Sequence, residues 1–339
     1  MKYRILGRTG LKVSQLCLGT MGYGDAGFWR AVGTLGIDSV KGQIQTAVDA
    51  GINFIDTANV YHAGGSEELV GEAIASLGIP RHELVIATKV RGTMGEGPND
   101  VGLSRYHIFN QVEDSLRRLR TDHIDLYQIH GVDPLTPMEE TLRALDDLVR
   151  SGKVRYLGVS NHAAWQIAKA LGISQRESLA RFESVQAYYS IAGRYLEREI
   201  VPLSEEEKLS ILVWSPLAGG LLSGKFDRDG GPDGSRRTTF DFPPVNLDRG
   251  WACVDAMREV ATNHDCSVAR VALAYCLAKP GITSLIIGAR TDAQLQDNLA
   301  AVDLTLSKDE LAKLDRVSAL PEEYPGWMIE RQTMGRRPE

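Results

Sequence analysis

The hydrophobic positions of this chain fall into short, nearly continuous runs that alternate with longer segments of helical periodicity. Most of the short runs lack a polar residue at every second position, which is typical of strands buried on both faces. The pattern predicts eight strands, namely Ser14–Gly19, Asn53–Asp56, Leu84–Lys89, Ile124–Ile129, Val154–Val159, Ser184–Ala187, Ile211–Trp214 and Ser284–Ile287.

Helical patterns lie between these runs. Ser66–Leu77 carries carboxylates in its first turn, whereas Arg105–Leu119 and Pro137–Arg150 repeat apolar residues at spacings of three and four. Strands that alternate with helices indicate parallel βα units. Because there are eight such strands in 339 residues, we expect a single (β/α)8 TIM barrel over residues 1–339 rather than an open, doubly wound sheet.

Other segments lie outside the repeating pattern. Residues 1–15 read as an N-terminal β-hairpin, with Tyr3–Leu6 and Lys12–Ser14 as its arms, and such a hairpin could close the bottom of the barrel. Residues 22–36 and 219–250 are too long for ordinary connectors, so we expect two mouth loops at the C-terminal face. Asp309–Val317 predicts a late helix, and residues 318–339 an irregular C-terminal tail.

The composition narrows the class of protein. Hydrophobic residues make up 43% and charged residues 24%, as in ordinary globular proteins. The formal net charge is −6 with scattered basic residues, which argues against nucleic acid as a partner. No apolar run has the about 20 residues of a membrane span, and no apolar segment near the N-terminus indicates a secretory signal. The four cysteines fit neither a zinc site nor a disulfide framework. We therefore expect a cytoplasmic protein without a metal site.

Polar side chains lie at the ends of three successive predicted strands. Asp56 ends the second strand and Tyr61 follows it, Lys89 ends the third, and His130 follows the fourth. Because the carboxyl ends of neighbouring parallel strands meet at the mouth of a barrel, these four side chains should lie together.

The four residues suit proton transfer to a carbonyl oxygen. A free phenol has a pKa of about 10, which is high for a proton donor at neutral pH. A lysine ammonium nearby should lower the pKa of Tyr61, and Asp56 can keep Lys89 charged. His130 can donate a hydrogen bond to the carbonyl oxygen and orient the substrate. This set lacks a source of hydride.

The chain resembles the aldo-keto reductase superfamily. The segment Gly51–Tyr61 (GINFIDTANVY), with Ser66-Glu67 after it, is similar to that family's signature, and the likeness extends from Tyr3 to about Asn298. It includes Lys89, His130 and the motifs Gly158-Val-Ser-Asn161, Val185-Gln186, Trp214-Ser-Pro-Leu217 and Ile287-Gly-Ala-Arg-Thr291. The last two motifs look like those of bacterial members near the potassium-channel β-subunit branch.

The resemblance implies an extended NADP(H) across the barrel mouth and reversible reduction of an aldehyde or ketone to an alcohol. It places Ser160, Asn161 and Gln186 at the nicotinamide carboxamide, Trp214 against the nicotinamide ring, and Thr20, Met21 and Asp56 beside it. Further along the cofactor, it places Ser215, Leu217, Gly219 and Lys225 around the pyrophosphate, with Arg236 closing the loop, and Gly288, Arg290, Gln294 and Asn298 toward the adenosine. Amides pair with a carboxamide, and arginines bind a 2′-phosphate in bidentate fashion, which favours NADPH over NADH.

One short motif points elsewhere. Residues 22–27 match G-x-G-x-x-G after a strand, but the dinucleotide-binding fold needs a helix to begin within the motif, and helical pattern starts only near Asp38. We reject that interpretation. Four aromatic residues are candidates for a substrate pocket instead, namely Phe28, Trp29, Trp251 and Trp327.

Three alternatives remain open. The chain could bind NADP(H) as a regulatory partner with little turnover, although the channel-like branch tends to have Asn where this chain has His130. It could run as an alcohol or sugar dehydrogenase in the oxidative direction. Lys89 could also form a Schiff base in a lyase, although pairing with Asp56 should keep it charged. The pattern leaves the small-molecule substrate and the oligomeric state undetermined.

Overall fold

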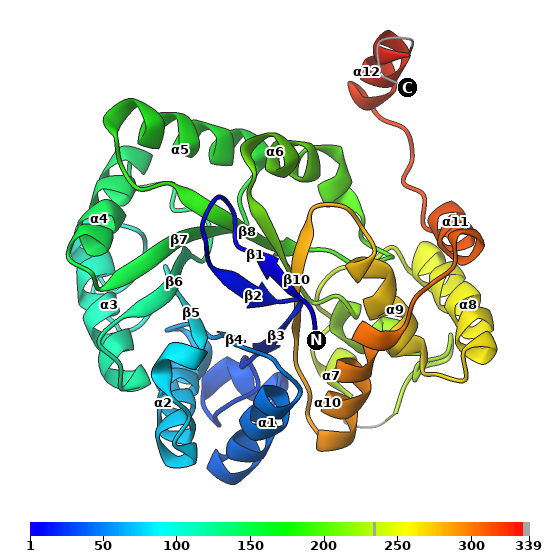
Figure 1. The fold of residues 1–339 in the computed structure, drawn as a ribbon, viewed down its shortest axis with the longest axis horizontal. Helices are drawn as coiled ribbons and strands as arrows, with labels where there is room; N and C mark the ends of the chain where they lie inside the picture. Colours follow the sequence, from blue (N-terminus) through cyan, green and yellow to red (C-terminus); the bar gives the residue numbers. More distant parts are fainter. Residues whose placement is uncertain (233–234, 335–339) are drawn as a thin grey trace.

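The computed structural model describes residues 1–232 and 235–334, and its centre is a closed barrel of eight parallel strands (Figure 1). Neighbouring strands follow chain order, and the last pairs with the first. This confirms the predicted (β/α)8 barrel, and each predicted run overlaps one strand. The barrel strands are β3 Leu16–Gly19, β4 Phe54–Asp56, β5 Val85–Val90, β6 Ile124–Ile129, β7 Val154–Ser160, β8 Phe182–Tyr188, β9 Ser210–Trp214 and β10 Ile282–Ile287.

Helices surround the barrel and bury their apolar faces against the strands (Figure 1). In α3, for example, Ser104 accepts a hydrogen bond from the His107 backbone N–H and so caps the N-terminus, while Ile108 and Val112 face the core. The helices are α1 Ile37–Asp49, α2 Gly65–Leu77, α3 Arg105–Leu119, α4 Met138–Arg150, α5 Ala164–Glu177, α6 Ile200–Glu207, α7 Arg236–Thr239, α8 Leu247–Asn263, α9 Val268–Leu277, α10 Asp292–Leu299, α11 Lys308–Val317 and α12 Gly326–Thr333.

The N-terminal hairpin closes one end of the barrel. Strands β1 (Tyr3–Ile5) and β2 (Lys12–Ser14) pair in antiparallel fashion, and the hairpin lies across the barrel in Figure 1. Leu6 and Val13 are fully buried and pack with Phe54 and Val85, which are the first residues of their strands. The hairpin therefore fills the N-terminal end, and the opposite end is left for the site.

Two segments depart from the sequence-based prediction. Residues 219–250 are not irregular throughout, because α7 lies within them and α8 already begins at Leu247. The tail is not irregular either, since it contains α12. This helix projects away from the barrel (Figure 1) and buries none of its residues. Because it packs on no core, its sequence has no apolar periodicity from which a helix could be predicted.

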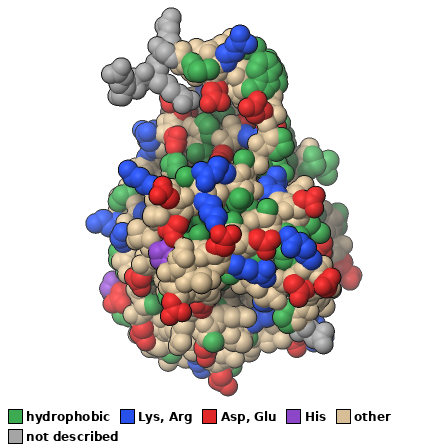
Figure 2. Space-filling model, turned by 90° about the vertical axis from the view of Figure 1, so that its right-hand side faces the viewer, with side chains coloured by type: hydrophobic (Ala, Val, Ile, Leu, Met, Phe, Trp, Pro, Cys, Tyr) green, Lys and Arg blue, Asp and Glu red, His purple; other side chains and the backbone are tan. Residues whose placement is uncertain are grey.

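The surface mixes charges of both signs. On the face shown in Figure 2, acidic and basic side chains are interspersed, and apolar side chains gather toward the projecting end that carries α12. None of the helices within residues 1–232 and 235–334 has both the length and the apolar character that crossing a membrane requires.

Candidate active site

Four titratable side chains meet at the open end of the barrel. The Lys89 ammonium donates hydrogen bonds to Asp56 Oδ1 at 2.5 Å and to the Thr57 carbonyl at 2.8 Å, and it lies 3.4 Å from the Tyr61 hydroxyl. The His130 ring meets the Tyr61 ring edge-on, with 5.8 Å between centroids. The structure thus brings together the four residues that the strand ends predict.

The buried Lys89–Asp56 ion pair anchors this group. Burial alone would lower the pKa of Lys89, but Asp56 and Tyr61 outweigh burial and raise it, so the amine is charged. The second carboxylate oxygen of Asp56 accepts hydrogen bonds from Gln186 Nε2 at 2.8 Å and Gln128 Nε2 at 2.9 Å. Gln128 was not predicted from the sequence, where its only signal is an amide inside the apolar run Ile124–Ile129. Every Asp56 oxygen is therefore fixed by a donor.

The pKa of Tyr61 moves in the opposite direction to the prediction. Burial raises the pKa of the phenol, and the nearby Lys89 lowers it only in part, with a smaller contribution from Arg236. The net pKa lies above the ordinary value. Tyr61 consequently holds its proton throughout the physiological range, and Lys89 limits the cost of losing it.

His130 is neutral. Burial, then Lys89 and Arg91, lower the pKa of its imidazole to about 3. A neutral imidazole still has one N–H to donate, so His130 can act as a hydrogen-bond donor without carrying charge. Its backbone carbonyl accepts a hydrogen bond from Asn161 Nδ2 at 2.9 Å, and Asn161 Oδ1 accepts one from Trp214 Nε1 at 3.1 Å. Asn161 therefore links His130 to Trp214.

The segment after Tyr61 holds the first mouth loop in place. His62 and Ala63 adopt left-handed backbone conformations, with φ of 51° and 54°. His62 Nδ1 accepts a hydrogen bond from the Ala26 backbone N–H at 3.0 Å, and its Nε2 lies 3.2 Å from the Met21 carbonyl. The loop then places Trp29 edge-on to Tyr61, with ring centroids 4.9 Å apart.

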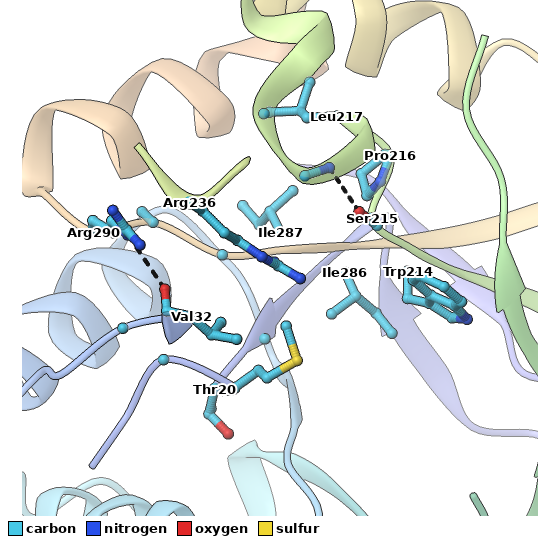
Figure 3. Close-up of a pocket in the computed structure, with 18 of the residues that line it drawn as sticks. Thr20, Val32, Trp214, Ser215, Pro216, Leu217, Arg236, Ile286, Ile287 and Arg290 are labelled. Atoms are coloured by element: carbon cyan, nitrogen blue, oxygen red, sulfur yellow. Dashed lines mark hydrogen bonds between the residues drawn. The ribbon is translucent and has the colours of Figure 1, made fainter. Parts of the chain in front are cut away.

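An elongated cavity of about 720 Å³ extends from Tyr61 and His130 to α10. In Figure 3, Arg236 reaches into it between Arg290 on one side and Trp214 on the other. Nearly all predicted cofactor residues line this cavity, namely Thr20, Met21, Asp56, Asn161, Gln186, Trp214, Ser215, Leu217, Gly219, Lys225, Arg236, Gly288, Arg290, Gln294 and Asn298. Lys89 and Ser160 lie behind its wall, both buried.

Three cationic side chains share the cavity wall. Burial, then Arg290, lower the pKa of Arg236 to about 10, and the same two causes lower the pKa of Lys225. Among the residues that the structure describes, the buried Arg236 Nε has no hydrogen-bond partner, and neither has the buried Ser160 Oγ. A bound polyanion would offset the repulsion among these cations and would accept a hydrogen bond from the unpaired Arg236 Nε–H. These residues therefore suit the phosphates of a dinucleotide.

The backbone after β9 bends sharply to form part of this wall. Ser215, Ala218, Gly219 and Gly220 all have positive φ, and Ser215 Oγ accepts a hydrogen bond from the Gly219 N–H at 3.0 Å. A Cβ on Gly219 would lie 2.4 Å from the Phe242 carbonyl oxygen. Only glycine fits there, because the turn and the loop 235–246 approach so closely.

The aromatic candidates divide into two pairs. Phe28 and Trp29 line the cavity. The prediction was wrong for the other two, since Trp251 packs on the core from α8 and Trp327 lies on the projecting α12. Phe240 and Phe242 line the cavity instead, and sequence reasoning missed them because they follow no strand and have no periodicity. Only a short 3-10 helix, Gly27–Ala31, begins at the last residue of the G-x-G-x-x-G segment, and α1 starts at Ile37.

Comparison with known proteins gives one family. The family model described as "Aldo/keto reductase family" matches residues 15–319. An uncharacterized oxidoreductase of Bacillus subtilis, YrpG, is 39% identical over 94% of this chain and 96% of its own length. An Arabidopsis thaliana protein named "Probable voltage-gated potassium channel subunit beta" is 35% identical over 94% of this chain and 96% of its own. A versiconal hemiacetal acetate reductase of Aspergillus parasiticus is 35% identical over 96% and 99%.

Proposed function

Since the chain belongs to the aldo/keto reductase family, we propose that it is an NADP(H)-dependent oxidoreductase that reduces an aldehyde or ketone, with Tyr61 as the proton donor. The observation that supports this most is the arrangement at the barrel mouth. A protonated phenol and a neutral imidazole, with a buried ammonium beside the phenol, lie at one end of a cavity whose wall also carries Lys225, Arg236 and Arg290. The reverse oxidation uses the same groups.

In the proposed reaction, the carbonyl oxygen lies between the Tyr61 hydroxyl and the His130 N–H. A nicotinamide cofactor held in the cavity would supply the hydride. As negative charge develops on the substrate oxygen, Tyr61 transfers its proton to it, and the Lys89 ammonium stabilises the phenolate that remains. Asp56, held by Gln128 and Gln186, keeps Lys89 charged and directed at Tyr61.

The cofactor assignments follow the shape of the cavity. Lys225 and Arg236 would hold the pyrophosphate beside the turn at Ser215–Gly219, and Arg290 would hold the 2′-phosphate near Gln294 and Asn298. Gln294 Oε1 already accepts a hydrogen bond from the Arg290 backbone N–H at 2.9 Å, and Asn298 Nδ2 donates to the Gly288 carbonyl at 3.3 Å. These two hydrogen bonds fix the backbone at Gly288 and Arg290, where the adenosine would bind.

Two features argue against the alternatives. A Schiff-base lyase needs an accessible neutral amine, whereas Lys89 is 0% exposed and bound to Asp56. A regulatory partner with little turnover is compatible with the likeness to the Arabidopsis protein, but it gives no reason for His130 and Tyr61 to face the cavity. Absorbance loss of NADPH with a panel of aldehydes and ketones tests the proposal. Tight NADPH binding without turnover of any carbonyl compound would favour the regulatory alternative.

Replacing Arg290 with Met should reduce the preference for NADPH over NADH. Loss of charge-assisted hydrogen bonds to a phosphate costs about 1.5–3 kcal/mol, so Kd for NADPH should rise about ten- to a hundredfold. Kd for NADH should change less than about threefold on the same reasoning. Fluorescence titration measures both, with Arg176→Met on α5 as a control. Equal losses for the two cofactors would mean that Arg290 acts through the loop carbonyls of Ala31 and Val32, to which it also donates.

The pH profile of reduction should contain no ionisation of His130. Because the pKa of His130 is lowered to about 3, the imidazole is neutral across the working range. The pKa of Tyr61 is raised, so its proton is lost only at alkaline pH. We expect kcat/KM to vary less than about twofold between pH 5.5 and 8 and to fall on the alkaline side. A bend near pH 6.5 that disappears in His130→Gln would contradict this assignment.

A further inference from the structure

His62 follows Tyr61 directly and joins it to the first mouth loop. It is only 3% exposed. Its Nδ1 accepts a hydrogen bond from the Ala26 backbone N–H at 3.0 Å, and its Nε2 lies 3.2 Å from the Met21 carbonyl oxygen. The imidazole also packs on Gly24, where an added Cβ would lie 2.7 Å from His62 Cγ. The ring is therefore held between two backbone groups and has little room to turn.

These two contacts define the protonation state of the imidazole. Nδ1 must be unprotonated because a backbone N–H can only donate, and Nε2 must carry a hydrogen because a carbonyl oxygen can only accept. Only the neutral tautomer with its hydrogen on Nε2 meets both conditions. A second proton, on Nδ1, would place two donors 3.0 Å apart at Ala26 and remove that hydrogen bond.

The contact at Ala26 holds the tip of the first mouth loop, residues 25–34. This tip places Trp29 edge-on to Tyr61, with ring centroids 4.9 Å apart. Two backbone carbonyls of the tip also accept hydrogen bonds from the Arg290 side chain. Release of Ala26 would therefore loosen both the wall beside Tyr61 and the support of Arg290.

We propose that His62 is a positioning residue that fixes the loop tip beside Tyr61 only while its imidazole is neutral, so that the tip opens more often as the solution becomes acidic. Its role in positioning rests on the proposed carbonyl reduction at Tyr61. In the open loop the imidazole is solvated and has the ordinary pKa of about 6.5. In the closed loop burial lowers the pKa of His62, and the Met21 carbonyl and Asp25 raise it by less. Closure is therefore fully favoured above about pH 6.5 and weakens as the pH falls below that value.

The charged groups on the elements packed against His62 include one rival for this titration. They are Asp25 and Arg30 on the loop, Glu67 and Glu68 in the first turn of α2, Arg118 on α3, and Lys89 and Asp56 behind Tyr61. The rival is Glu67, because burial raises the pKa of its carboxyl. Glu67 accepts hydrogen bonds from Thr88 and Arg118, neither of which belongs to the loop. Replacing His62 alone therefore separates the two groups.

Amide hydrogen exchange in the full chain, without added nucleotide, reports on this contact directly. The protection factor of the Ala26 amide, corrected for the intrinsic pH dependence of exchange, should fall about three- to tenfold between pH 7.5 and 5.5. Because the open form stays a minor population, exchange detects the change while turnover hardly does. The Leu35 amide donates to the Gly22 carbonyl at the base of the loop and should keep its protection. Constant protection at Ala26 would overturn the proposal.

His62→Asn is the matched variant that cannot titrate. Asparagine tolerates the left-handed backbone at this position, where φ is 51°, and its Oδ1 can accept from the Ala26 N–H in place of Nδ1. The protection of Ala26 should then be independent of pH. His82→Asn, in the exposed turn Arg81–Glu83, should keep the wild-type dependence. A pH dependence that persists in His62→Asn would assign the titration to Glu67 and overturn the role of His62.

The ratio kcat/KM with NADPH tests the positioning role. His62→Ala leaves the Ala26 N–H without its acceptor and should lower kcat/KM about tenfold, whereas His62→Asn should stay within about threefold of wild type. If both variants keep wild-type kcat/KM, or both fall equally, the positioning role is wrong. A chain that reduces no carbonyl compound would refute the proposed function. The exchange measurement needs neither cofactor nor substrate, so it would still decide whether neutral His62 fixes the loop.

Discussion

Replacing Tyr61 with Phe should lower kcat for carbonyl reduction by about a hundred- to ten-thousandfold, the range that general acid catalysis contributes. The substitution removes one oxygen and keeps the ring, so the edge-on contacts with Trp29 and His130 persist. Because the Tyr61 hydroxyl lies 3.4 Å from Lys89 and that ammonium keeps two shorter bonds, the ion pair should remain intact. Stopped-flow measurement of hydride transfer and a binding titration with NADPH give the two readouts.

A second tyrosine provides the control for this experiment. Tyr23 lines the same cavity, is buried, and donates its hydroxyl to Gln43 at 3.1 Å, away from Lys89. Tyr23→Phe deletes a buried hydroxyl in the same cavity, and its kcat should stay within about tenfold of wild type, as one lost neutral hydrogen bond costs about 1 kcal/mol. If Tyr61→Phe kept more than a tenth of wild-type kcat, another group would be the proton donor.

The sequence predicted the positions of the proposed catalytic residues because parallel strands impose them. Asp56 and Lys89 end predicted strands, and strand ends converge in any closed parallel barrel. The hydrophobic pattern alone locates these strand ends. Gln128 escaped it because a polar residue within a strand has no partner until the barrel closes and brings Asp56 within 2.9 Å.

Quantities that depend on packing could not be predicted in the same way. The nearby Lys89 ammonium lowers the pKa of Tyr61, and this contribution can be expected from the sequence. Burial raises the same pKa by more, and the depth of burial is known only from the folded structure. The same holds for the aromatic residues Phe240 and Phe242 in the cavity wall. They lie in a loop without periodicity, and tertiary contacts hold that loop over Trp214, among them the hydrogen bonds of Arg237 to the Ala218 and Pro243 carbonyls.

Replacing Lys89 with Met should reduce both stability and activity. Lys89 is 0% exposed and its carboxylate partner is buried with it, so the variant leaves the Asp56 charge without a counter-ion. Breaking a buried pair from one side costs about 3–5 kcal/mol. The amides of Gln128 and Gln186 still donate to Asp56, which places the expected loss near the lower end. Urea unfolding measures it, and kcat should fall by at least about a hundredfold because the phenolate loses its stabilising charge.

The double variant Asp56→Asn/Lys89→Met separates the two roles of Lys89. With no buried charge left, its free energy of unfolding should return to within about 1–2 kcal/mol of wild type, since neutral replacement of a buried pair costs little. Its kcat should stay as low as that of Lys89→Met, because no ammonium faces the Tyr61 hydroxyl. Recovery of kcat together with stability would mean that Lys89 only holds Asp56 in place. Continued inactivity in a stable protein means that the ammonium acts on Tyr61 during proton transfer, as its place 3.4 Å from the hydroxyl indicates.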